Sequence, residues 1–163
     1  MIGWLLQLRN NVVERWRWFW GLRGRPDTAA SKRGQQGETE AAQFLRDRGW
    51  KIVARNWQNG RDELDLVAWD GEVLVFVEVR TRASRAVVSG YHSVTARKKR
   101  ALARAARAYL RGLTPPPAHF RFDIVEVKVC DDVSPEVLLH SGIPLFPKNF
   151  HATRGSGRPF SHG

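Results

Sequence analysis

Acidic side chains interrupt two neighbouring hydrophobic segments of this chain. Glu63 and Asp65 lie in residues 63–69, and Glu78 lies with Arg80 in residues 73–80, both segments rich in Leu, Val and Phe. Such flanks are typical of interior strands, where a charge is costly unless it is paired or binds a metal ion. The pattern therefore indicates carboxylates kept for chemistry or for a buried charge network.

The pairing of these two segments decides whether the charges meet. Asp70-Gly71 is a strong hairpin signal, and a two-residue loop there predicts that Trp69 lies opposite Glu72. In that register Glu63 is opposite Glu78 and Asp65 is opposite Phe76. Since opposed residues and residues two apart share a sheet face, the segments should present Glu63, Asp65, Glu78 and Arg80 on one side.

Carboxylates gathered in this way repel one another, and a divalent cation relieves the repulsion. Hard oxygen ligands without a neighbouring His or Cys suit Mg²⁺ or Mn²⁺. The alternative is a structural network in which Arg80 and Arg82 neutralise Glu78 and Glu63. The face geometry alone leaves both interpretations open.

A glutamate on the preceding segment is expected to join the group. Glu38 recurs with Ala41, Ala42 and Leu45 at intervals of 3, 4 and 7 residues, so it lies on the sheet-facing side of a helix. The alternative is a first-turn glutamate favoured by the helix dipole.

The elements that must position these residues follow the order αβββαβ. The pattern predicts a helix from Gly37 to Gly49 and another over residues 93–111, capped by Ser93 or Thr95. Strands are expected at residues 50–57, 63–69, 73–80 and 119–129, with an edge strand at 137–143. The predicted fold class is α/β, with a mixed central sheet flanked by helices.

The second helix carries a stripe of one charge sign. The chain has 27 Lys+Arg against 16 Asp+Glu, a formal net charge of +11, which points to a polyanionic partner. The stripe predicts contacts to nucleic-acid phosphates, although a plain solvated face would show the same pattern. Its candidate binding residues are Arg97, Lys98, Arg100, Arg104, Arg107 and Arg111.

Three segments divide the chain: residues 1–33, 34–146 and 147–163. Trp and Arg interleave over residues 1–22, and this pattern predicts an amphipathic helix. Residues 26–34 resemble a linker, and residues 147–163 are expected to form a disordered tail. The helix could lie on an anionic membrane surface, pack on the main domain or a partner, or come from a misplaced start. Cys130 is the only cysteine, which fits a reducing compartment, and a cytoplasmic location is expected.

Several motifs occur in a familiar order: Gly37-Glu38, Arg55-Asn56, Glu63-Leu64-Asp65, Glu78-Val79-Arg80 and Arg121-Phe122-Asp123. Over residues 34–129 the chain resembles the small bacterial UPF0102 (YraN-like) family. That family is similar to the restriction-endonuclease-like PD-(D/E)xK nucleases, especially the archaeal Holliday-junction resolvases. The resemblance implies a restriction-endonuclease-like core.

The resemblance also implies site residues. Asp65, Glu78, Glu38 and the Val79 carbonyl would bind the metal. Arg80 would occupy the basic position of the (D/E)xK element, and Glu63 would support the site from the first or second shell of ligands. Asp65, Glu78, Arg80 and Glu38 are therefore the expected catalytic group. Two departures stand out: Asp62 replaces the usual Gly, and Arg80 replaces the catalytic Lys. Arginine stays protonated and cannot act as a base, although it can stabilise charge.

The expected function is a Mg²⁺- or Mn²⁺-dependent endonuclease acting on DNA, with branched DNA the first candidate substrate. One alternative is a non-catalytic nucleic-acid-binding module whose degenerate site is filled by Arg80; a second is a membrane-surface adaptor that uses residues 1–22. A homodimer is expected only by analogy with resolvases.

Overall fold

The computed structural model describes residues 28–83, 94–129 and 134–146. The predicted N-terminal helix at 1–22 and the predicted tail at 147–163 lie outside these residues. In the part of the chain that is described, no helix combines the length and the apolar character needed to cross a bilayer.

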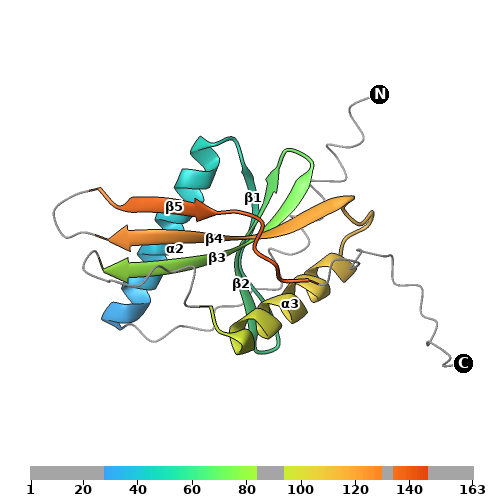
Figure 1. The fold of residues 1–163 in the computed structure, drawn as a ribbon, viewed down its shortest axis with the longest axis horizontal. Coiled ribbons are helices and arrows are strands. Elements are labelled where there is room, and N and C mark those ends of the chain that lie inside the picture. Colours follow the sequence, from blue (N-terminus) through green and yellow to red (C-terminus); the bar gives the residue numbers. More distant parts are fainter. Residues whose placement is uncertain (1–27, 84–93, 130–133, 147–163) are drawn as a thin grey trace, which may run out of the picture.

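The described elements follow the predicted αβββαβ order, and the predicted edge strand is also present, at residues 136–140 instead of 137–143 (Figure 1). In chain order they are α2 (Ala29–Asp47), β1 (Lys51–Asn59), β2 (Asp62–Asp70), β3 (Val73–Ala83), α3 (Ala96–Arg111), β4 (His119–Val129) and β5 (Glu136–His140). Of the two predicted caps of α3, Ser93 and Thr95, the structure uses Thr95, whose side chain accepts a hydrogen bond from the Lys98 backbone N–H.

The five strands form one sheet in the order β1-β2-β3-β4-β5. β3 and β4 are parallel, and every other neighbouring pair is antiparallel. Parallel neighbours require a crossover connection, and α3 supplies it. The predicted mixed sheet and the restriction-endonuclease-like core are therefore confirmed.

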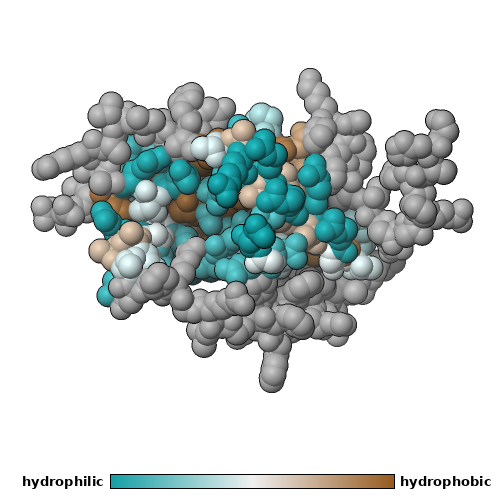
Figure 2. All heavy atoms as spheres, turned by 90° about the horizontal axis from the view of Figure 1, so that it is seen from below, coloured by the Kyte–Doolittle hydropathy of each residue, from teal (hydrophilic) through white to brown (hydrophobic). Residues whose placement is uncertain are grey.

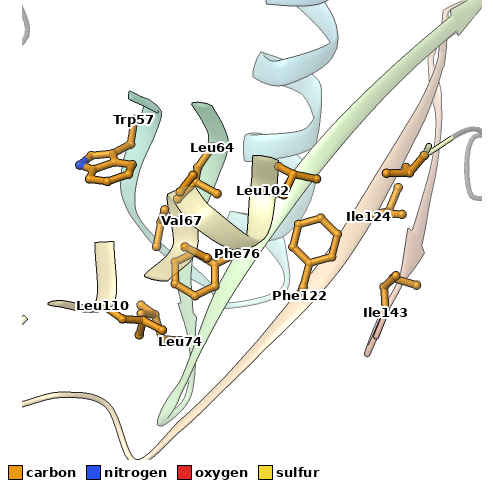
Figure 3. Packing of buried hydrophobic residues seen from close by; sticks show 13 residues of the cluster. Trp57, Leu64, Val67, Leu74, Phe76, Leu102, Leu110, Phe122, Ile124 and Ile143 are labelled. Carbon is orange, nitrogen blue, oxygen red and sulfur yellow. The ribbon is translucent and has the colours of Figure 1, made fainter. Parts of the chain in front are cut away.

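Alternate residues of β3 belong to two separate hydrophobic cores, one under each helix. Leu74 and Phe76 pack with Leu102 and Leu110 of α3 (Figure 3). The second core joins Val75 and Val77 to the α2 side chains Ala41, Ala42 and Leu45. The period-2 alternation of β3 thus holds the two helices on opposite faces of the sheet.

The start of α2 differs from the prediction. Residues 26–34 were expected to be a linker, but the helix already begins at Ala29, where Thr28 accepts a hydrogen bond from the Ser31 backbone N–H at 3.1 Å. None of residues 29–36 is buried, so these first two turns carry no apolar stripe. Hydrophobic periodicity therefore could not reveal them.

Gly37 allows α2 to approach the sheet closely. A Cβ atom at this position would overlap the side chain of Thr81 on β3. The glycine therefore brings the next residue, Glu38, against the sheet, where it is buried.

The β2–β3 hairpin has a different register from the predicted one. Asp70 pairs with Val73 and Trp69 with Leu74, so the loop is Gly71-Glu72 and not Asp70-Gly71. Gly71 has a φ of 56°, which suits glycine at the first central position of a tight hairpin loop. The ladder ends at Leu66 and Val77, so the predicted pairing of Glu63 with Glu78 is not formed, and the Asp65 side chain instead accepts a hydrogen bond from the Val79 backbone N–H, next to Glu78.

Candidate active site

A pocket of about 500 Å³ opens where the N-terminal turns of α2 and α3 meet β2 and β3. We call it the carboxylate pocket. Its lining residues are Ala30, Ser31, Gly34, Glu38, Glu63, Asp65, Glu78, Val79, Thr81 and Lys98. The first turns of α2, which the sequence pattern did not reveal, thus form one wall of the pocket.

Three separate elements bring buried carboxylates to the pocket. Glu38 of α2, Asp65 of β2 and Glu78 of β3 are 6%, 8% and 2% exposed, respectively. Acidic residues are almost never buried to this extent unless they are paired or hold an ion. The structure therefore gathers the three carboxylates that the sequence singled out, whereas Glu63 lines the same pocket half-buried.

Asp65 is held by the backbone of the neighbouring strand. Its Oδ2 atom accepts a hydrogen bond from the Val79 N–H at 2.8 Å. Burial, and next the negative charge of Glu78, raise the pKa of Asp65 to about 8. Near neutral pH this carboxyl therefore keeps its proton unless additional positive charge enters the pocket.

Glu78 lies between two cations. Its Oε1 atom is 3.6 Å from Nη1 of Arg80, and its Oε2 atom is 3.0 Å from Nζ of Lys98. Oε2 is buried, and the approach of Lys98 lacks hydrogen-bond geometry. Lys98, predicted to bind phosphates on the outer face of α3, therefore points into the carboxylate pocket.

Arg80 has a second acidic neighbour, to which no role was assigned from the sequence. It pairs in register with Glu126 of β4, which is buried, and Glu126 in turn lies 3.5 Å from Nε2 of His140 on β5. The signal was available, because Glu126 interrupts a hydrophobic strand just as Glu78 does. Arg80 thus belongs to a row of ionisable side chains that crosses three strands.

The donor set of the pocket fits a hard divalent cation. Its carboxylates are oxygen donors of the kind that such an ion prefers, and Oε2 of Glu78 is a buried oxygen without a hydrogen bond. Within residues 28–83, 94–129 and 134–146, however, no three Asp, Glu, His or Cys side chains already converge closely enough to hold an ion. The carboxylates line the pocket without forming a ready-made cage.

The basic stripe on α3 is partly engaged by the protein itself. Arg104 donates two hydrogen bonds to Asp62, at 2.8 and 2.7 Å, and these lower the pKa of Asp62. Arg107 is half-buried, with its guanidinium 5.6 Å from the centre of the Phe146 ring. The exposed basic residues of the stripe, besides Arg104, are Arg97, Arg100 and Arg111.

Asp62 stands where the resemblance implies a Gly, and no role was predicted for it. It pairs with Asn59 at the turn between β1 and β2, and its carboxylate binds Arg104 in the middle of α3. The departure thus adds an ion pair between the sheet and the helix that carries Lys98.

The chain is similar to proteins that share this part of its sequence. A family model described as "Uncharacterised protein family UPF0102" matches residues 37–127. A UPF0102 protein of Symbiobacterium thermophilum, STH1475, is 50% identical over 95 residues, which cover 58% of this chain and 80% of that protein. CT2262 of Chlorobaculum tepidum is 46% identical over 94 residues, covering 58% and 73%. The matched region runs from Gly37 to Val127, so it contains the carboxylate pocket except for the first turns of α2. The chain therefore belongs to the UPF0102 family.

Proposed function

We propose that this protein is a divalent-metal-dependent endonuclease that hydrolyses phosphodiester bonds of DNA, with branched DNA the first substrate to test. The observation that carries the proposal is the carboxylate pocket. Three buried acids from α2, β2 and β3 line one opening beside the basic N-terminal turn of α3. A purely structural role would call for a full set of partners at each acid, and Oε2 of Glu78 has no hydrogen bond.

The pocket residues divide the chemistry among them. Asp65 and Glu78, with the Val79 carbonyl and Glu38, would hold Mg²⁺ or Mn²⁺. When bound, such an ion lowers the pKa of a water ligand and stabilises negative charge on a phosphate. In the reaction the water oxygen bonds to phosphorus, the bond from phosphorus to a sugar oxygen breaks, and that oxygen takes up a proton while the attacking water gives one to solvent.

Substrate contacts are expected on both sides of the pocket. Arg97 and Arg100 are exposed near the start of α3, and Lys32 and Arg33 are exposed on the first turns of α2. The surface seen from below in Figure 2 is largely hydrophilic over the described residues. Basic side chains of this kind bind the phosphate backbone and not particular bases, so we expect binding that depends on DNA shape and on salt.

Cleavage assays test the proposal. Wild-type protein is incubated with linear, single-stranded, forked and four-way DNA, with Mg²⁺, with Mn²⁺ or with EDTA. We expect metal-dependent cutting of at least one substrate, and a loss of about a hundredfold or more in Asp65→Asn and Glu78→Gln. Equal cutting by these variants would defeat the assignment of the pocket.

A second candidate function is a nucleic-acid-binding module without catalysis. The position of Lys98 favours it, because the ammonium already neutralises Glu78 at 3.0 Å. Calorimetric titration separates the two functions. The binding module predicts salt-dependent DNA binding with no specific uptake of Mg²⁺ or Mn²⁺, whereas the nuclease predicts uptake that Glu78→Gln removes.

A further inference from the structure

The carboxylate pocket contains a cation from an unexpected element. The (D/E)xK pattern places its positive residue on the strand, two residues after the acid, and here that residue is Arg80. Lys98 comes instead from the first turn of α3, and its Nζ atom reaches Oε2 of Glu78 at 3.0 Å. Two cations therefore flank one carboxylate, and each approaches a different oxygen.

Arg80 is the less suitable of the two for a role in the reaction. Its guanidinium faces Oε1 of Glu78 at 3.6 Å, and across the β3–β4 ladder its register partner is the buried Glu126. It lies in the row of ionisable side chains that runs from Glu78 to His140 at the edge strand β5. Arg80 is absent from the residues that line the pocket, and Lys98 is one of them.

Lys98 is placed to act on a bound group. Its side chain is 38% exposed, whereas Glu78 is 2% exposed, so the ammonium lies at the open end of the carboxylate. Its contact with Oε2 lacks hydrogen-bond geometry. The three N–H donors of a lysine ammonium can therefore turn to another acceptor without breaking a formed hydrogen bond.

We propose that Lys98 is the catalytic cation of the carboxylate pocket, donating to the phosphate under attack in place of the lysine that Arg80 has replaced. The inference rests on the proposed nuclease function and assigns one residue of its chemistry. A compact ammonium beside the reacting phosphate stabilises the charge that develops in the transition state. The same ammonium competes with a divalent cation for Oε2 of Glu78.

The neighbouring lysine provides a matched control. Lys99 is adjacent on α3 and half-buried, and it does not line the pocket. Lys98→Met and Lys99→Met remove the same charge from the same turn of the helix. A difference between them therefore reports on the pocket and not on the net charge of the protein.

Three measurements on the full chain test the inference. In single-turnover cleavage, Lys98→Met should be slower by about a hundredfold or more, whereas Lys99→Met should stay within a few-fold of wild type. DNA affinity should fall to the same small extent in both variants. Mn²⁺ affinity, measured by calorimetry without DNA, should rise several-fold in Lys98→Met only, since the competing cation is gone.

The possible results distinguish a failure of the role of Lys98 from a failure of the nuclease function. Wild-type protein that cuts while Lys98→Met cuts equally fast overturns the role of Lys98 and leaves the nuclease function standing. Unchanged or weaker Mn²⁺ binding in Lys98→Met likewise overturns the competition for Glu78. Wild-type protein that cuts no substrate overturns both. Should Lys98→Met fail to fold, Lys98→Arg keeps the charge beside Glu78, and undiminished cleavage by it would contradict the need for a compact ammonium.

Discussion

Buried acids occur in two regions of one sheet, and the two regions differ in how their charges are satisfied. Asp123 on β4 is fully buried and accepts hydrogen bonds from Nε of Arg121 at 3.0 and 3.1 Å and from the Gly142 N–H at 2.9 Å. Arg121 also binds Asp70 at 2.8 Å. We call these residues the Asp123 cluster. Every charge in this cluster faces an opposite charge.

The carboxylate pocket is the opposite case. Asp65 and Glu78 lie close enough for the charge of Glu78 to raise the pKa of Asp65, and one oxygen of Glu78 has no hydrogen bond. Both regions carry motif residues of the same family resemblance, so residue type alone does not distinguish them. The difference lies in the partners: the Asp123 cluster is complete as it stands, and the pocket gains from an added cation.

The largest loss of stability that we expect from a single substitution lies in the Asp123 cluster. Asp123→Ala leaves Arg121 with one acidic partner and removes the acceptor of the Gly142 N–H, so we expect a loss of about 2–4 kcal/mol in the free energy of unfolding. Urea unfolding measures it. Glu136→Ala, which breaks the exposed pair with Lys128, is the control and should cost less than about 1 kcal/mol. Equal losses of stability in the two variants would show that the buried Asp123 contributes no more to stability than an exposed ion pair does.

The raised pKa of Asp65 in the carboxylate pocket should make the free energy of unfolding depend on pH. The pKa of Asp65 is about 8 in the folded protein and near its ordinary value of 3.8 in the unfolded chain. The folded state thus binds the proton more tightly, so this stabilisation is complete below pH 4 and is lost as the pH rises from about 4 to 8. We expect the unfolding free energy of wild type to fall relative to that of Asp65→Asn across this range, by the order of a few kcal/mol without divalent metal.

Parallel curves for the two proteins between pH 4 and 8 would contradict the predicted protonation of Asp65. Asp123→Asn cannot serve as a substitute control, because it also removes the negative charge that Arg121 binds.

A smaller effect is expected where α2 meets the sheet. In Gly37→Ala the new methyl group would overlap Thr81, so α2 must shift and the stability should fall by about 1–3 kcal/mol. Gly34→Ala provides the control, since its Cβ would meet no atom within 4 Å and alanine favours the helix. A double variant with Thr81→Ala should regain part of the loss in thermal unfolding. Equal stability of the two alanine variants would show that the close contact between Gly37 and Thr81 does not fix the position of α2 against the sheet.

The smallest effect concerns the outer face of α3. Arg100→Gln should reduce the slope of log DNA affinity against log salt by about one, as expected for one lost phosphate contact. Arg104→Gln should change the slope less, because Asp62 already binds its guanidinium at 2.7 and 2.8 Å. Fluorescence anisotropy at several salt concentrations measures both slopes. A larger change for Arg104 would mean that it leaves Asp62 to bind DNA.

Much of this arrangement could be predicted from the sequence, because periodicity reports burial. The alternation along residues 73–80 placed Glu78 correctly, and the 3–4 spacing of Ala41, Ala42 and Leu45 placed Glu38 against the sheet. The hairpin register differs from the predicted one by two in the sum of paired residue numbers, which keeps residues 66–70 and 73–77 on their predicted faces.

The sequence could not show where long side chains end. Lys98, Arg104 and Arg107 are all basic residues on one helix, and spacing assigned them one role. The structure gives them different partners: Glu78 at the pocket, Asp62 at the β1–β2 turn and the ring of Phe146. These contacts bridge elements far apart in the chain, so they depend on tertiary packing that a local pattern does not contain.

Binding of Mn²⁺ to the metal-free protein tests most directly whether the carboxylate pocket holds a divalent cation. The full chain is titrated with Mn²⁺ by calorimetry and by electron paramagnetic resonance, alongside Asp65→Asn and Glu78→Gln. We predict saturable binding at the pocket in wild type that each substitution weakens at least about tenfold. Wild-type protein that takes up no Mn²⁺, or variants that bind it as tightly as wild type, would contradict the assignment.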